Sequence, residues 1–129
     1  MPPAAPDAAA PIDRRQIGQH AEERAARHLC TAGLIVLHRN YRCRLGELDL
    51  VAREGATLVV AEVRLRASAQ YGGAAASITR AKRRRIVLAT RHLLARYPSL
   101  QRLPVRFDAL LVPAGDGAIE WLRGAFDAY

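Results

Sequence analysis

The chain has 129 residues, of which 50% are hydrophobic and 25% are charged, a composition that indicates one globular domain and excludes a largely disordered chain. No apolar run approaches the ~20 residues that a membrane-spanning helix needs. The 20 Lys and Arg outnumber the 12 Asp and Glu, and the formal net charge of +8 at pH 7 favours a polyanionic partner such as nucleic acid, with a merely well-solvated surface as the alternative.

Two helices and five strands are predicted behind a tail rich in Pro and Ala at residues 1–13, which we expect to be disordered. The elements are, in chain order, a helix over 14–33, strands over 34–40, 46–54 and 57–66, a helix from 77 or 79 to 97, and strands over 104–113 and 118–124. Helices mixed with strands in this order predict an α/β or α+β fold with a central mixed β-sheet flanked by helices, in a single domain over residues 14–129.

The segments 46–54 and 57–66 form a predicted hairpin that carries an unusual group of charges. Glycine comes first in the two-residue connection Gly55-Ala56, which is typical of a type II′ turn. That turn places Asp49 directly opposite Glu62, with their Cβ atoms about 5 Å apart. Two carboxylates at this distance repel each other unless a cation lies between them. The hairpin therefore predicts a site at which Asp49 and Glu62 bind a divalent metal such as Mg²⁺.

The alternation of side chains in a strand gives each hairpin strand one apolar face. In the first strand of the hairpin this face consists of Leu48, Leu50 and Ala52. The same register places Glu47 opposite Arg64. An ordinary cross-strand ion pair between these two residues, with Asp49 and Glu62 exposed to water, is the alternative to a metal site.

Several short motifs follow one another along the chain: Gly18 and Glu22 in a GxxxE pattern, GELDLV, VVAEVRLR, a helix that carries a lysine, and RFDALL. In this order they resemble the YraN-like family of uncharacterised bacterial proteins. The resemblance extends from Gln16 to Phe126. That family is similar to the restriction-endonuclease-like, PD-(D/E)XK superfamily, in particular to its Holliday-junction-resolvase branch.

The resemblance implies a restriction-endonuclease-like fold, a metal-dependent phosphodiesterase site that uses Mg²⁺ or Mn²⁺, and a nucleic-acid substrate. By position, Asp49 and Glu62 correspond to the two acids of the superfamily motif. Glu22 corresponds to the additional helix glutamate of the resolvase branch, and Arg64 occupies the place of the motif lysine. Resolvase relatives act as dimers, so the resemblance also allows a homodimer.

Arginine at position 64 departs from the superfamily pattern. A guanidinium stays protonated, so Arg64 does not easily replace a lysine that helps to orient or deprotonate water. Arg64 then acts as an electrostatic clamp, or catalysis is weak or lost. Lys82 is the only lysine in the chain and hence the only residue able to supply an ammonium instead.

Three further groups of residues are candidates for a role at the site. The basic run at the start of the second predicted helix consists of Lys82, Arg83, Arg84 and Arg85. Cations there oppose the helix dipole, so contact with phosphate is one explanation and an exposed basic helix start is the other. Asp108 in RFDALL either supports the site, as the family pattern favours, or serves a sheet interaction. Glu47 is a second supporting candidate.

Two functions follow from these predictions. The first is a metal-dependent endonuclease that acts on branched or single-stranded DNA, with DNA favoured over RNA. The second is a nucleic-acid-binding module on the same fold with little or no cleavage. A membrane partner is not expected, because the basic residues do not form one amphipathic anchor. Cys30 and Cys43 are too few for a disulfide framework, and the tail does not read as a signal peptide, which favours a cytoplasmic protein.

Overall fold

A computed structural model describes residues 14–66 and 78–128, so the predicted tail lies outside the described residues. The elements are α1 (Arg14–Thr31), β1 (Ile35–Cys43), β2 (Gly46–Glu54), β3 (Thr57–Arg66), α3 (Arg80–Arg96), a short 3₁₀ helix (Pro98–Leu100), β4 (Val105–Pro113) and β5 (Glu120–Phe126). The order of helices and strands is the predicted one. None of the described helices is both long and apolar enough to cross a membrane.

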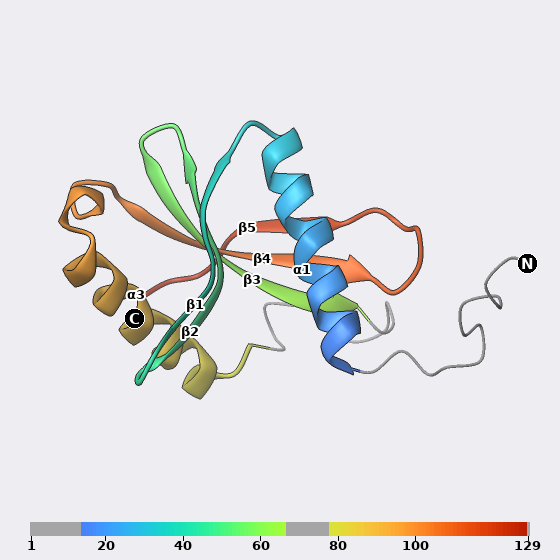
Figure 1. Cartoon of the computed structure of the whole chain (residues 1–129), viewed down its shortest axis with the longest axis horizontal. Helices are drawn as coiled ribbons and strands as arrows, with labels where there is room; N and C mark the ends of the chain where they lie inside the picture. The colour runs from blue at the N-terminus through green and yellow to red at the C-terminus, as the bar shows by residue number, and fades with distance from the viewer. Residues whose placement is uncertain (1–13, 67–77, 129) are drawn as a thin grey trace, which may run out of the picture.

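The five described strands form one mixed sheet in the order β1-β2-β3-β4-β5. Neighbouring strands are antiparallel except β3 and β4, which run parallel and are connected through α3. Helices α1 and α3 lie on opposite sides of the sheet (Figure 1). This arrangement confirms the predicted α+β fold with a central mixed sheet flanked by helices.

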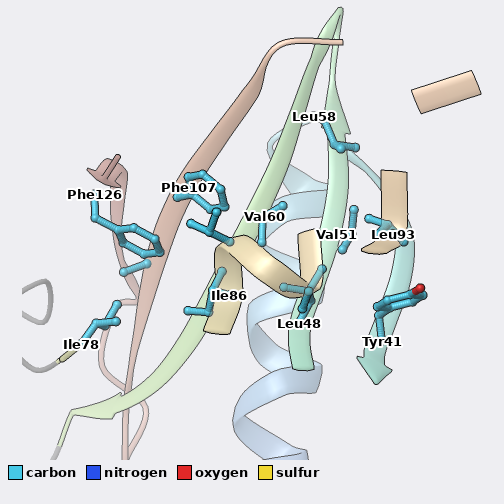
Figure 2. Packing of buried hydrophobic residues seen from close by; sticks show 13 residues of the cluster. Tyr41, Leu48, Val51, Leu58, Val60, Ile78, Ile86, Leu93, Phe107 and Phe126 are labelled. Carbon is cyan, nitrogen blue, oxygen red and sulfur yellow. The ribbon is translucent and has the colours of Figure 1, made fainter. Parts of the chain in front are cut away.

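Each helix buries an apolar stripe against its own face of the sheet. On the α1 face the buried residues are mostly small or branched: Ala21, Ala25, Ala26, Leu29, Leu34, Leu50, Ala52, Val59, Ala61, Leu110 and Val112. The alanines of α1 allow the helix to approach the sheet closely. The larger core on the α3 face includes Leu48, Val51, Leu58, Val60, Ile86, Leu93, Phe107 and Phe126 (Figure 2).

Helix α3 begins and ends where local signals predict. The Thr79 hydroxyl accepts a hydrogen bond from the backbone N–H of Lys82 at 3.1 Å, which caps the first turn. Pro98 follows the last residue of the helix by two positions, and proline cannot continue a helix. The stripe formed by Ile86, Ala89 and Leu93 is buried, as the period of the sequence predicts.

The β2–β3 hairpin has the predicted register from Glu54 opposite Thr57 to Leu50 opposite Ala61. Gly55 has φ of 57°, as the first position of a type II′ turn requires. The predicted alternation of β2 is wrong, however. Leu50 and Ala52 pack on the α1 face, whereas Leu48 packs on the α3 face. The strand therefore changes its orientation at Asp49.

The neighbouring strand β1 changes face at the same level of the sheet. Asn40 has φ of 52°, a left-handed conformation that asparagine tolerates better than most residues. It lies opposite Asp49, between the pairs Arg39–Leu50 and Tyr41–Leu48. Arg39 reaches Glu23 on α1 at 2.8 Å, whereas Tyr41 belongs to the core under α3. Strand β1 also continues to Cys43 instead of ending at Asn40 as predicted.

Candidate active site

Asp49 and Glu62 meet where the β2–β3 register ends. Beyond Leu50 and Ala61, the Oδ2 atom of Asp49 accepts a hydrogen bond from the backbone N–H of Val63 at 2.9 Å. Both carboxylates are buried, with 9% of Asp49 and 5% of Glu62 exposed. The change of face at Asp49 thus directs an acid into the gap between the two strands.

The environment of Glu62 favours its protonated form. Burial, the charge of Asp49 and a hydrogen bond with Asp49 raise the pKa of Glu62 to about 8, against the opposing charges of Lys82 and Arg64. At neutral pH the carboxyl group of Glu62 therefore tends to keep its proton. A divalent cation between them would have the same effect as that proton, since it offsets the repulsion of two buried negative charges.

Lys82 reaches this acid pair from α3. Its Nζ atom lies 3.4 Å from Oε1 of Glu62, and 25% of its side chain is exposed. The Thr79 cap fixes the turn that carries Lys82. A close contact holds the helix against the β1–β2 turn, because a Cβ atom on Gly46 would lie only 2.8 Å from the backbone oxygen of Arg85. Glycine at position 46 therefore permits the approach that brings Lys82 to Glu62.

Glu22 approaches the acids from the other side of the sheet, on α1. Burial raises the pKa of Glu22, and the charges of Asp49 and Glu47 add to the effect. A hydrogen bond with the side chain of Asn40 opposes the rise. Asn40 thus connects the helix glutamate to the point at which β1 and β2 change face.

The remaining hairpin charges are arranged differently from the simple cross-strand prediction. Arg64 of β3 is close enough for its charge to oppose the rise in the pKa of Glu62. Glu47 forms an ion pair with Arg42 of β1, with 3.4 Å between Oε2 and Nε. Glu47 and Arg64 were predicted to lie directly opposite each other. The β2–β3 register, however, ends at the pair Leu50–Ala61, before it reaches them.

Asp108 is fully buried, and its hydrogen bonds go to β4 and β5. It accepts two from the guanidinium of Arg106 and one each from Trp121 Nε1 and the backbone N–H of Gly124, all at 2.9 Å. The β4–β5 register shifts between Phe107 and Ala109, beside this carboxylate. These contacts favour the sheet interaction that the sequence left open over direct support of the acid pair.

The basic run at the start of α3 divides into side chains with different environments. Lys82 and Arg85 line a hollow next to the acids. Arg83 turns back, so that its Nε donates to the backbone oxygen of Ile78 at 2.9 Å and its guanidinium lies 5.6 Å from the Phe126 ring centre. Arg84 is exposed. The run is therefore not one uniform basic surface.

The donor atoms at the site suit a hard divalent cation bound by few protein ligands. Within residues 14–66 and 78–128, no group of three or more His, Cys, Asp or Glu side chains is arranged to hold a metal ion. The candidate ligands are the two carboxylates of Asp49 and Glu62. Mg²⁺ is commonly bound by one or two carboxylates while it keeps several waters, so this pair fits the ion that the sequence predicts.

Two features of the site were not predicted from the sequence: the hydrogen bond of Asn40 with Glu22 and the contact of Lys82 with Glu62. An asparagine at the end of a predicted strand, such as Asn40, is a weak signal for a left-handed residue. No local signal places Lys82 beside Glu62, because the contact depends on how α3 packs across the sheet.

The chain is similar to members of one protein family over most of its length. The family described as "Uncharacterised protein family UPF0102" matches residues 21–112. A UPF0102 protein of Methylobacillus flagellatus is 50% identical over 115 residues, which cover 88% of this chain and 99% of the relative. One of Paracidovorax citrulli is 57% identical over 118 residues, covering 88% of this chain and 84% of the relative. One of Legionella pneumophila is 43% identical over 111 residues, covering 86% and 94%.

The matched region contains Glu22, Asp49, Glu62 and Lys82, so the whole candidate site lies inside the part that the family shares. The resemblance to the YraN-like family that the motifs carry is confirmed. The chain belongs to the uncharacterised protein family UPF0102.

Proposed function

We propose that the protein binds nucleic acid and hydrolyses its phosphodiester bonds with the help of Mg²⁺ or Mn²⁺. One observation carries the proposal: Asp49 and Glu62 lie together between β2 and β3, and Lys82 of α3 contacts Glu62. The two carboxylates are buried, whereas Lys82 is partly exposed. Two buried carboxylates, of which Glu62 has a raised pKa, together with a nearby ammonium are typical of a site that handles charge during a reaction.

Each residue has a role that follows from its chemistry. Asp49 and Glu62 would hold the metal, which when bound lowers the pKa of a water molecule and offsets charge on a phosphate. The Val63 N–H fixes the carboxylate of Asp49 in the gap. Lys82 has three N–H donors with which to hold a phosphate oxygen or the attacking water beside Glu62. Arg64 adds a permanent positive charge.

Lys82 is the feature that favours an enzyme over a pure binding module. The superfamily lysine is replaced by Arg64 on β3, but an ammonium reaches the same carboxylate from α3. The position of the cation relative to Glu62 matters more for electrostatic stabilisation than the element that carries it.

The substrate class follows from charge and from the family resemblance. The net charge of +8 favours a polyanion, and arginine supplies nearly all of the basic groups. Arginine suits bidentate contact with phosphate. DNA is the favoured substrate, and branched or single-stranded DNA is the form that the resolvase resemblance suggests.

A nicking assay with paired variants tests the proposal. Supercoiled plasmid, a four-way junction and single-stranded DNA are incubated with Mg²⁺ or Mn²⁺ and with EDTA. We expect metal-dependent cleavage that Asp49→Asn and Glu62→Gln abolish and that Asp116→Asn preserves. Asp116 is a matched control, since it is an exposed acid in the loop between β4 and β5. Absence of cleavage on all substrates with both metals would refute the catalytic proposal.

A nucleic-acid-binding module is the second candidate, and the arginine at position 64 is the observation that favours it. In that case the wild type binds DNA with strong salt dependence but cuts none of the substrates. Asp49→Asn and Glu62→Gln then leave the affinity unchanged or raise it, because they remove negative charge that repels phosphate.

A further inference from the structure

A hollow of about 440 Å³ lies directly beside the acid pair. Its walls come from the end of β1, the start of β2 and the first turns of α3. The residues that line it are Arg42, Cys43, Gly46, Glu47, Lys82, Arg85 and Ile86. Lys82 also contacts Glu62, so one side chain connects the hollow to the acid pair.

The lining of the hollow is positively charged. Three cations, Arg42, Lys82 and Arg85, are opposed by a single acid, Glu47. Arg42 pairs with Glu47 at 3.4 Å, but 75% of its side chain is exposed, so it can also turn towards a ligand. Among residues 14–66 and 78–128, the side chain of Arg85 forms no hydrogen bond or ion pair. The hollow therefore holds positive charge that the described protein groups do not neutralise.

The position of the cations on α3 makes an anion the matching ligand. The first turn of α3 contains no acidic residue, although acids are favoured there by the helix dipole. Lys82 and Arg85 lie in the first two turns of α3, near the positive end of the helix dipole, which disfavours cations. A bound anion offsets both the dipole and the side-chain charges.

The two walls of the hollow are held at a fixed separation. The absence of a side chain at Gly46 lets the β1–β2 turn contact the backbone of Arg85, since an added Cβ would come within 2.8 Å of that carbonyl oxygen. Arg42 on one wall and Arg85 on the other are thus carried by backbone segments that touch. A preformed site of this kind loses less conformational freedom on binding than a flexible basic surface does.

We infer that the hollow is a binding subsite for a backbone phosphate of the nucleic-acid strand whose neighbouring phosphodiester lies on Asp49 and Glu62. The inference rests on the proposed function, because it assigns the substrate strand a path across the same site. Lys82 lies between the two positions and contacts the acid pair. Arg85 and Arg42 hold the adjacent phosphate from opposite walls.

Binding to a fluorescein-labelled single-stranded oligonucleotide, measured by anisotropy in EDTA, tests this without any cleavage. We expect Arg85→Gln to weaken the affinity about 5-fold to 10-fold and to reduce the salt slope by about 0.7, as for the loss of one phosphate contact. Arg42→Gln should act in the same direction. The matched control is Arg91→Gln, an exposed arginine on the same helix outside the hollow, for which the affinity should change by less than about 2-fold.

Three results would overturn the inference. Equal losses for Arg85→Gln and Arg91→Gln would show that only net charge matters. No loss for Arg85→Gln would exclude the hollow from the binding path. In the third, Arg85→Gln lowers the affinity for inorganic phosphate but leaves the affinity for the oligonucleotide unchanged. The hollow would then be a site for free phosphate rather than for a nucleic-acid strand.

The test separates this inference from the catalytic proposal. If the wild type binds the oligonucleotide with the expected dependence on Arg85 but does not cleave DNA, the phosphate subsite is supported and the nuclease proposal is refuted. Wild type that cleaves DNA while Arg85→Gln and Arg91→Gln bind equally well leaves the nuclease in place and removes the subsite.

Discussion

The ammonium nitrogen of Lys82 lies 3.4 Å from Oε1 of Glu62, so the start of α3 and the middle of β3 meet at one buried carboxylate. Lys82 is the only lysine in the chain. Arg64 lies two residues after Glu62, at the position where the PD-(D/E)XK motif that the sequence resembles has lysine. The site therefore has an ammonium and a guanidinium near the same acid, carried by different elements.

If Lys82 supplies the ammonium that the motif lacks, then Lys82→Met should lower the single-turnover cleavage rate about 100-fold, as for loss of one charged donor in an active site. Arg64→Lys alone should cleave about as fast as wild type. In the Lys82→Met background, Arg64→Lys should restore at least about tenfold, or 1.4 kcal/mol of barrier, because it returns an ammonium next to Glu62. If Lys82→Met cleaved DNA at the wild-type rate, Lys82 would not supply the missing ammonium.

Mg²⁺ should stabilise the folded protein through Asp49 and Glu62, whether or not DNA is cut. At a concentration ten times the dissociation constant, binding adds about 1.4 kcal/mol to the free energy of unfolding. We expect the melting temperature to rise with Mg²⁺ for wild type and for the control Asp116→Asn. Asp49→Asn should show no rise. An equal rise in Asp49→Asn would place the metal elsewhere.

Signals confined to a few neighbouring residues were sufficient to predict much of this fold. Thr79 and Pro98 mark the ends of α3, because capping and the loss of a backbone N–H act within one turn. Gly55 fixes the hairpin register, which brings Asp49 towards Glu62. These features depend on local backbone chemistry, so no knowledge of the tertiary structure is needed to find them.

The parts that sequence alone did not predict depend on contacts between distant elements. The change of face at Asp49 requires Asn40 in a left-handed conformation on a different strand. Strict alternation therefore placed Leu48 on the wrong face. The Lys82–Glu62 contact depends on the packing of α3 across the sheet and on the close approach at Gly46.

The stability of the metal-free protein should fall as the pH rises from about 5 to 8. Burial and the charge of Asp49 raise the pKa of Glu62 from 4.5 in the unfolded chain to about 8 in the folded protein. The folded state then binds the proton more tightly, so this contribution is fully present below pH 4.5 and is lost as the pH approaches 8.

Glu62→Gln should remove this dependence, because glutamine does not titrate. Urea unfolding in EDTA should show the variant more stable than wild type at pH 8, by on the order of 3 kcal/mol, and about equally stable at pH 5. The conservative change keeps the volume of the side chain. Parallel pH profiles for wild type and Glu62→Gln would show that Glu62 does not carry the raised pKa.

Asp108 should be important for stability rather than for chemistry. Asp108→Ala leaves the Arg106 guanidinium, the Trp121 N–H and the Gly124 N–H without their shared acceptor. Loss of one partner from a buried charged network costs about 3–5 kcal/mol. Glu54→Ala, which removes a partly exposed partner of Arg106, should cost less in the same urea titration. A larger cost for Glu54→Ala would place the main anchor of Arg106 at the hairpin turn.

Gly46 should be required for the approach of α3 to the acids. In Gly46→Ala the new methyl group would lie 2.8 Å from the Arg85 oxygen, so the β1–β2 turn and the helix must move apart. We expect a loss of about 1–3 kcal/mol in stability, as for overpacking, and a weaker affinity for the oligonucleotide because the walls of the hollow separate. Gly18→Ala is the matched control. Gly18 lies in α1 with open space where the methyl group would go, so alanine there should stabilise by about 0.5–1 kcal/mol through helix propensity. Urea titrations measure the stability of both variants, and anisotropy measures the oligonucleotide affinity. A Gly46→Ala protein with the stability and affinity of wild type would show that the contact with Arg85 does not set the position of Lys82.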